Sequence, residues 1–278
     1  MTAQYLPAAY SLTAMSVWGA SDFLGGIGAK RANAFLFTAI VHATGIALIG
    51  SLALLTHAEV PETGGIFWAL IAGGVGGTSL AIFYRALATG KMGLTAPVVA
   101  VLGAGIPTVV GAFTQGFPGY RPVAGFVLAG IGVWLISRTE DATHPEGLGL
   151  AALAGVGFAA YYICIHRAGT ASALWLAVVS RLAALLVTSA IVLAGRQLRS
   201  IPAPVLAIAL LAGCLDITGS VTFIRANQIG RLDAAVVLSS LYPAVTALLA
   251  RFFLHEHFSR GRTVGMLAAL AAVPMIAG

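Results

Sequence analysis

Residues 223–265 repeat, 140 positions later, the pattern of residues 83–125. An ungapped alignment pairs five positions, namely Arg85 with Arg225, Ala86 with Ala226, Gly90 with Gly230, Lys91 with Arg231, and Gly125 with Gly265. Each copy covers the end of one apolar segment, the whole of a second and the start of a third, and each full segment has the roughly 20 residues that a helix needs to cross a bilayer. The chain is therefore predicted to be a duplication built from membrane-spanning helices.

The composition agrees with a membrane protein. Of the 278 residues, 59% are hydrophobic and 9% are charged, whereas soluble domains carry about 25% charged residues. The net charge is +6, but the basic residues occur singly or in pairs between apolar segments, as topology signals and lipid contacts do, so we expect no nucleic-acid partner. Cys164 and Cys214 lie inside apolar segments and are expected to be small buried hydrophobic residues. No cleavable signal peptide is predicted, because the N-terminus lacks a basic region followed by an apolar run and a cleavage site, so the first helix itself is expected to target the chain.

The predicted fold class is an all-α polytopic membrane protein with ten transmembrane helices. We expect the helices at residues 7–27, 34–56, 65–88, 93–114, 120–138, 147–167, 173–194, 203–227, 231–254 and 260–278. The polar connection 138–146 divides them into two five-helix repeats, residues 1–140 and 147–278. Five is an odd number, so the second repeat enters the membrane from the opposite side. Inverted repeats of this kind enclose a central cavity with the substrate site near the middle of the bilayer.

The distribution of Lys and Arg predicts the orientation. Ten of these residues lie nearest the connections that follow helices 1, 3, 5, 7 and 9, and four lie on the opposite side. The count places both termini outside the cytoplasm.

The start and the end of the chain resemble a known family. Trp18-Gly19 and Asp22-Phe23 near the start, with Tyr242-Pro243, Glu256 and Gly265 near the end, resemble the EamA-type branch of the drug/metabolite transporter (DMT) superfamily. The first half departs from this pattern, with Gln115-Gly116 at the place of the acidic residue. The resemblance implies a bacterial cytoplasmic (inner) membrane protein that exports amino acids, similar metabolites or drugs. It also implies cytoplasmic termini, and this conflict with the Lys and Arg count is left open.

Ionisable residues within apolar segments are the leading site candidates, because each costs roughly 2.5–3.5 kcal/mol to place in a bilayer. Asp22, Arg181 and Asp216 are the three such residues selected. Two roles stay open for them, contact with the substrate and mutual pairing that only holds helices together. Trp18 lies one turn before Asp22, so an indole and a carboxylate share one helix face and can bind an organic cation, although aromatic residues near helix ends also serve as interface anchors.

Further substrate-binding candidates are the polar side chains His42, Tyr84, Tyr162 and Tyr242. Pro107 and Pro243 lie within equivalent helices of the two halves and are predicted hinges, since proline frees a carbonyl one turn earlier. The glycines of residues 73–77 are expected to permit close helix packing. The cluster His255, Glu256 and His257 is more typical of a solvated loop than of a metal site, so no metal is predicted.

The sequence therefore predicts a secondary active transporter that works by alternating access and has no cofactor. There is no GxxxxGK[ST] motif for ATP, and no HExxH motif or acid pair of the kind an intramembrane enzyme needs. The expected partners are a small-molecule substrate, membrane lipid and possible coupling protons, which Asp22 or Asp216 can carry because burial favours a neutral carboxyl group. An uptake permease of the same family, a channel and a non-transporting scaffold remain as alternatives.

Overall fold

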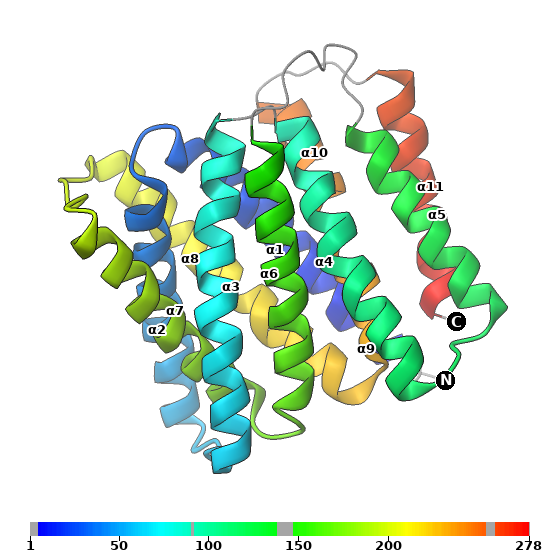
Figure 1. Cartoon of the computed structure of the whole chain (residues 1–278), viewed down its shortest axis with the longest axis horizontal. Coiled ribbons are helices and arrows are strands. Elements are labelled where there is room, and N and C mark those ends of the chain that lie inside the picture. Colours follow the sequence, from blue (N-terminus) through cyan, green and yellow to red (C-terminus); the bar gives the residue numbers. More distant parts are fainter. Residues whose placement is uncertain (1–4, 90–91, 138–146, 254–258, 278) are drawn as a thin grey trace.

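The computed structural model describes residues 5–89, 92–137, 147–253 and 259–277. Eleven helices form from these residues (Figure 1). They are α1 (Leu6–Ala29), α2 (Ala34–Leu55), α3 (Thr63–Thr89), α4 (Met92–Gln115), α5 (Tyr120–Ser137), α6 (Leu148–Arg167), α7 (Ala173–Ala194), α8 (Ala203–Ile229), α9 (Leu232–Ser239), α10 (Tyr242–Phe253) and α11 (Arg260–Ala277). Within the described residues, a helix corresponds to each of the ten predicted ranges, and the ninth range is divided into α9 and α10. The predicted seam at 138–146 lies outside the described residues.

Seven helical segments of the described chain are long and apolar enough to span a membrane. They are α2, α3, α4 from Val98, α6, α7, α8, and α9 with α10 taken together. The apolar stretches of α5 and α11, Tyr120–Leu135 and Thr263–Ile276, are shorter. α1 has the length but contains Ser11, Ser16, Ser21 and Asp22 among its residues. The protein is an integral membrane protein. Ten spans are predicted from the sequence, and seven of the described segments meet the length and composition criterion for crossing a membrane.

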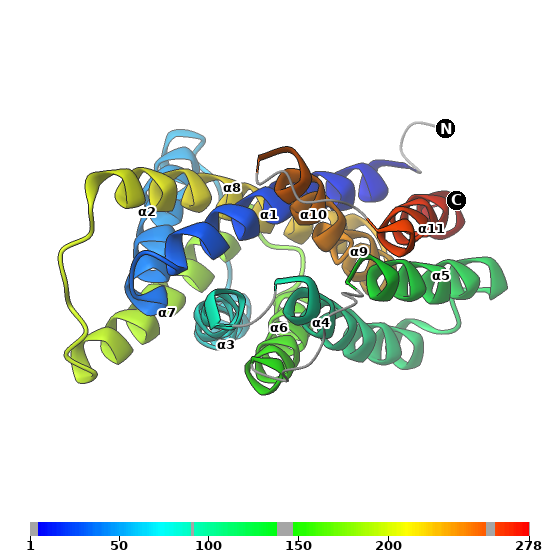
Figure 2. The same cartoon turned by 90° about the horizontal axis from the view of Figure 1, so that it is seen from above.

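Helices from the two parts of the chain interleave instead of forming separate bundles. The most extensive contacts join α5 to α11, α1 to α8, and α3 to α6, followed by α3 to α7, α4 to α6, and α2 to α7, and every one of these pairs crosses the 138–146 connection. Figure 2 shows α1 and α8 running alongside each other across the molecule, with α3, α4 and α6 on one side of them. The residues that line the centre therefore come from both parts of the chain.

Glycines on α3 allow the closest of these approaches. A Cβ atom at Gly73 would overlap the backbone of Ser180 on α7, and one at Gly77 would lie 2.6 Å from the Cα atom of Ala184. Lipid offers little apolar driving force for helix association, so membrane helices associate through such close contacts between small residues. The predicted packing role of the glycine-rich stretch agrees with these contacts.

Gly73→Ala is accordingly expected to lower the free energy of unfolding by about 1–3 kcal/mol, because the added methyl group must displace backbone. Gly74→Ala is the matched control, since its nearest neighbour outside its own helix backbone would be a Val187 methyl group at 3.9 Å. Thermal unfolding in detergent measures both variants. Equal melting temperatures for the two would contradict the packing role of Gly73.

The interruption between α9 and α10 follows from Pro243. Proline has no backbone N–H, and its ring collides with the carbonyl group four residues earlier. That carbonyl group belongs to Ser239, the last residue of α9, and the chain turns at Ser240 and Leu241 before α10 begins at Tyr242. α4, in contrast, continues through Pro107. Only one of the two predicted hinge prolines coincides with a helix break, and hinge motion at either stays a prediction.

Candidate functional site

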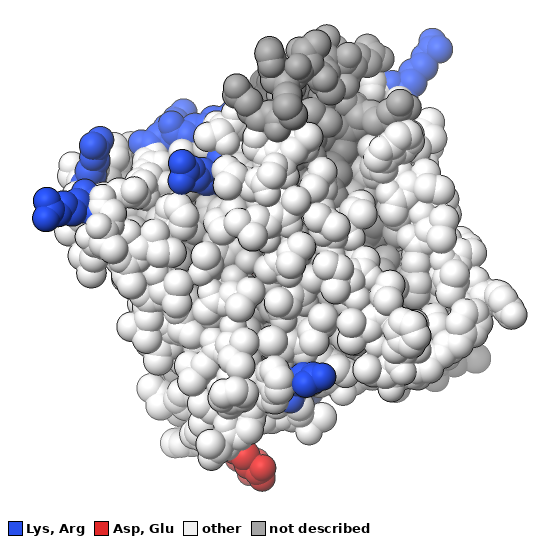
Figure 3. Space-filling view, in the orientation of Figure 1, with Lys and Arg blue, Asp and Glu red and all other residues white. Residues whose placement is uncertain are grey.

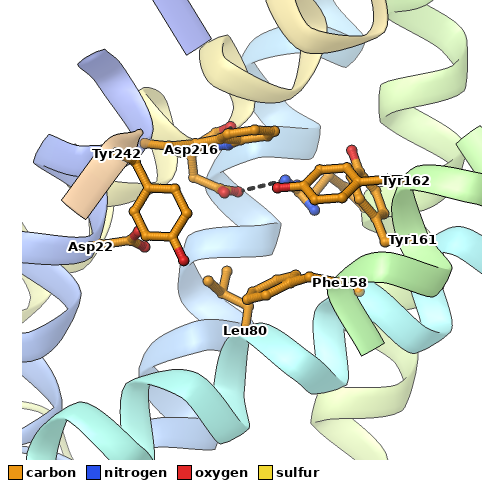
Figure 4. Close-up of a pocket in the computed structure, with 10 residues that line it drawn as sticks. Asp22, Leu80, Phe158, Tyr161, Tyr162, Asp216 and Tyr242 are labelled. Atoms are coloured by element: carbon orange, nitrogen blue, oxygen red, sulfur yellow. Dashed lines mark hydrogen bonds and ion pairs between the residues drawn. The ribbon is translucent and has the colours of Figure 1, made fainter. Parts of the chain in front are cut away.

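A small cavity lies at the centre of the molecule, where six helices meet (Figure 4). Its volume is about 40 Å³. The part of the chain before the 138–146 connection contributes Trp18, Asp22, Gly76 and Leu80. The part after it contributes Phe158, Tyr161, Tyr162, Arg181, Asp216 and Tyr242. Six of the eight substrate-binding residues predicted from the sequence therefore line one cavity.

An ion pair forms one side of the cavity. Nη2 of Arg181 lies 2.8 Å from Oδ2 of Asp216, and both side chains are 6% exposed. The same nitrogen donates to the hydroxyl oxygen of Ser220, whose hydroxyl group donates in turn to the carbonyl oxygen of Asp216 at 3.0 Å. Nε of Arg181 has no hydrogen-bond partner among the described residues. The pair thus holds α7 to α8 and still presents an unused donor.

Asp22 lies on the other side of the cavity, beside the ring of Tyr242 (Figure 4). The residue is 7% exposed. Within the described part of the chain its carboxylate makes no hydrogen bond or ion pair. A buried carboxylate is costly unless it is protonated or meets a cation. The geometry therefore provides one uncompensated acidic group that can accept a proton or a positively charged solute.

Aromatic rings form the wall next to the ion pair. The lining residues Trp18 and Tyr162 both pack against Phe223, whose ring lies 5.6 Å from that of Trp18 and 4.8 Å from that of Tyr162, and the lining rings of Tyr162 and Tyr161 lie 5.5 Å apart. The indole N–H of Trp18 donates to the carbonyl oxygen of Asp216 at 3.2 Å, which fixes the ring against α8. Such faces attract organic cations through cation–π interaction. The cavity combines this wall with two carboxylates and one guanidinium group.

Two predicted residues lie outside the cavity lining. His42 on α2 is fully buried, and neither of its ring nitrogens has a hydrogen-bond partner among the described residues. Tyr84 on α3 packs its ring against Gly25, and its hydroxyl group lies 3.3 Å from that of Ser21. Cys164 is buried as expected, whereas Cys214 is only partly buried. The cluster His255, Glu256 and His257 lies outside the described residues.

The sequence-based selection missed lining residues of two kinds. Leu80 and Phe158 carry no charge or hydrogen-bonding side chain, so a search for ionisable groups in apolar segments passes over them. Their spacing does carry a signal, since Phe158 precedes Tyr162 by four residues and so shares its helix face. Tyr161 is a polar residue in the same apolar segment as Tyr162, but the sequence analysis predicts only Tyr162 as a site residue.

A second polar contact, away from the cavity, also joins the two parts of the chain. Arg231 donates to both carboxylate oxygens of Asp233, at 3.1 and 2.8 Å, and to the carbonyl oxygens of Gln115 and Gly116 at 3.2 and 2.7 Å. Its hydrogen bond with Asp233 raises the pKa of Arg231, so the guanidinium group stays charged at physiological pH. The end of α4 is thereby tied to the start of α9.

Comparison with known proteins agrees with a membrane transporter. Residues 145–278 match the model of the EamA-like transporter family. This half of the chain belongs to the EamA-like family of the DMT superfamily. The chain is similar to a protein of known crystal structure with 19% sequence identity. The alignment covers 97% of this chain and 95% of that protein's chain, with a TM-score of 0.78. That likeness shows a shared fold. No curated protein sequence matches the chain.

The EamA-like half supplies most of the polar cavity lining. Tyr161, Tyr162, Arg181, Asp216 and Tyr242 all lie within the matched residues. Trp18 and Asp22 come from α1, which precedes the matched region. The cavity is therefore asymmetric in charge, with the compensated acid in the EamA-like half and the unpaired acid in the other.

Proposed function

We propose that the protein is a secondary transporter that exports a small solute bearing a positive group, such as an amino acid or a similar metabolite or drug. Asp22 is the observation that carries this proposal, because its buried carboxylate lacks a partner among the described residues and faces a cavity walled by aromatic rings. An ammonium group of a solute would neutralise the carboxylate and contact the rings. The bacterial cytoplasmic membrane is the proposed location.

The proposed architecture is ten transmembrane helices in two inverted five-helix repeats, residues 1–140 and 147–278. The helix contacts support it. In this architecture α1 to α5 correspond, in order, to α6, α7, α8, α9 with α10, and α11. Replacing each helix by its counterpart turns the contact α1–α8 into α6–α3 and leaves the contacts α2–α7 and α5–α11 unchanged. These four pairs are among the six most extensive contacts in the described structure. Such an exchange is what a pseudo-two-fold axis between repeats produces.

Alternating access is the proposed mechanism. A cavity of about 40 Å³ is much smaller than the roughly 300–1,000 Å³ of a ligand pocket, so the solute can enter only after helices separate. The break before Pro243 lies next to Tyr242, which lines the cavity. Bending at this break, with a second bend at Pro107, would open the cavity. Asp22 would bind a proton and the solute cation in turn, which couples their movements.

Flux in proteoliposomes tests the proposal directly. The purified protein is expected to transport members of a panel of amino acids, amines and cationic drugs with saturable kinetics, and unlabelled solute on the opposite side is expected to accelerate the exchange. An imposed proton gradient should drive net movement if protons are coupled, and the direction of that movement separates export from uptake. Flux that never saturates would indicate a channel, and no flux of any panel member would favour a scaffold.

A further inference from the structure

A second, larger pocket lies at one end of the helices, between the α1–α2 and α7–α8 connections. Its volume is about 620 Å³. Both connections are at the upper left of Figure 1, and Figure 3 shows Lys and Arg side chains gathered along this upper edge of the molecule. The central cavity is lined by other residues, so the two spaces are distinct sites.

Four basic residues line this pocket. Lys30 and Arg31 come from the first connection, and Arg196 and Arg199 come from the second. No acidic residue is among the described lining residues, and none of the four basic side chains forms an ion pair within the described structure. Like charges around one pocket repel one another unless an anion lies between them. The arrangement therefore favours an anionic ligand.

The two connections are held together without that ligand. The side-chain oxygen of Asn33 accepts hydrogen bonds from the backbone N–H groups of Phe35 and Leu36, at 3.0 and 3.1 Å. The amide nitrogen of the same side chain donates to Oε1 of Gln197 at 2.7 Å. α1 and α7 end here while α2 and α8 begin here, so their helix dipoles largely cancel. The attraction for an anion comes from the four side chains on this preformed frame.

We propose that this pocket binds the phosphate group of an anionic membrane lipid. Guanidinium and ammonium groups are the usual protein ligands of phosphate. Leu36 and Ile201 also line the pocket, and Leu198 in the same connection is 68% exposed. Apolar side chains beside a phosphate site suit the glycerol and acyl portion of a lipid, which free phosphate lacks. The Lys and Arg count, taken without the family resemblance, would place this edge at the cytoplasmic leaflet, whose surface carries negative charge.

Lipid binding is tested with the full-length protein in detergent, by native mass spectrometry and by thermal unfolding with added lipid. Phosphatidylglycerol is expected to bind and to raise the melting temperature, and phosphatidylcholine is expected to do so at least tenfold more weakly. The double variant Arg196→Asn/Arg199→Gln is expected to lower the affinity for phosphatidylglycerol by on the order of tenfold or more, since each basic side chain near the surface contributes to the attraction. Asparagine tolerates the left-handed backbone at residue 196, where φ is 49°.

Matched controls separate the pocket from general surface charge. Arg85→Gln/Arg260→Gln removes two exposed basic side chains from outside the pocket and should bind phosphatidylglycerol like the wild type. Lys30→Gln/Arg31→Gln repeats the test from the other connection if the first variant folds poorly. Equal binding of both lipids, wild-type affinity in both pocket variants, or the same stabilisation by inorganic phosphate at equal concentration would overturn the proposal.

Discussion

Replacing Asp22 by asparagine is expected to lower transport of the cationic solute at least a hundredfold while leaving the protein folded. Asparagine has nearly the same shape as aspartate, so the packing of α1 against α8 should persist. The substitution removes the negative charge, however, and this charge lines the cavity. In the described structure no ion pair or hydrogen bond compensates it, so the cationic solute loses its binding partner. Uptake and exchange of labelled solute in proteoliposomes measure the effect.

Binding provides a second measure that does not depend on flux. A solute that binds only the folded protein raises its thermal stability in proportion to the logarithm of its concentration over the dissociation constant. This stabilisation should disappear in Asp22→Asn. Glu62→Gln serves as the matched control, because Glu62 is an exposed acid just before α3, away from the cavity. Unchanged transport by Asp22→Asn would remove Asp22 from the mechanism.

The helices could be predicted from the sequence because a bilayer requires long apolar segments, and such segments are visible without knowledge of tertiary contacts. The predicted range 93–114 and the observed α4 (Met92–Gln115) differ by one residue at each end. The interruption of the ninth segment also has a local cause, since Pro243 prevents a continuous helix. Whether Pro107 interrupts α4 could not be predicted in the same way, because neighbouring helices can accommodate a proline without a break.

The candidate site was found in part because charges in apolar segments are expensive. Asp22, Arg181 and Asp216 stand out for that reason, and all three line the cavity. The sequence indicates less clearly which face of each helix points toward the cavity. Leu80 faces the cavity, whereas Tyr84, one turn later on α3, packs against Gly25 of α1. Tyr84 was predicted as a site residue because it is polar, but the packing of α3 against α1 places it outside the cavity lining.

Arg181→Gln is expected to destabilise the protein by about 3–5 kcal/mol, because it leaves the buried carboxylate of Asp216 without its cation. Both side chains are 6% exposed, so solvent screens their interaction little. Asp216→Asn should be similarly destabilising, since the guanidinium group of Arg181 is then left unpaired. Thermal unfolding in detergent measures each single variant, and a marked loss of folded protein after purification would report the same effect.

The double variant Arg181→Gln/Asp216→Asn distinguishes the two roles that the sequence left open. Removing both charges should restore most of the stability lost in either single variant, because neither member of the pair is left without its partner, and the double-mutant cycle gives the coupling energy directly. A stable double variant that transports at the wild-type rate would mean that the pair serves only to hold α7 against α8. We expect instead a stable protein with greatly reduced transport, because the pair lines the cavity opposite Asp22 and Nε of Arg181 presents a donor that no described residue uses. A solute with both an ammonium and a carboxylate group would engage these two sides at once.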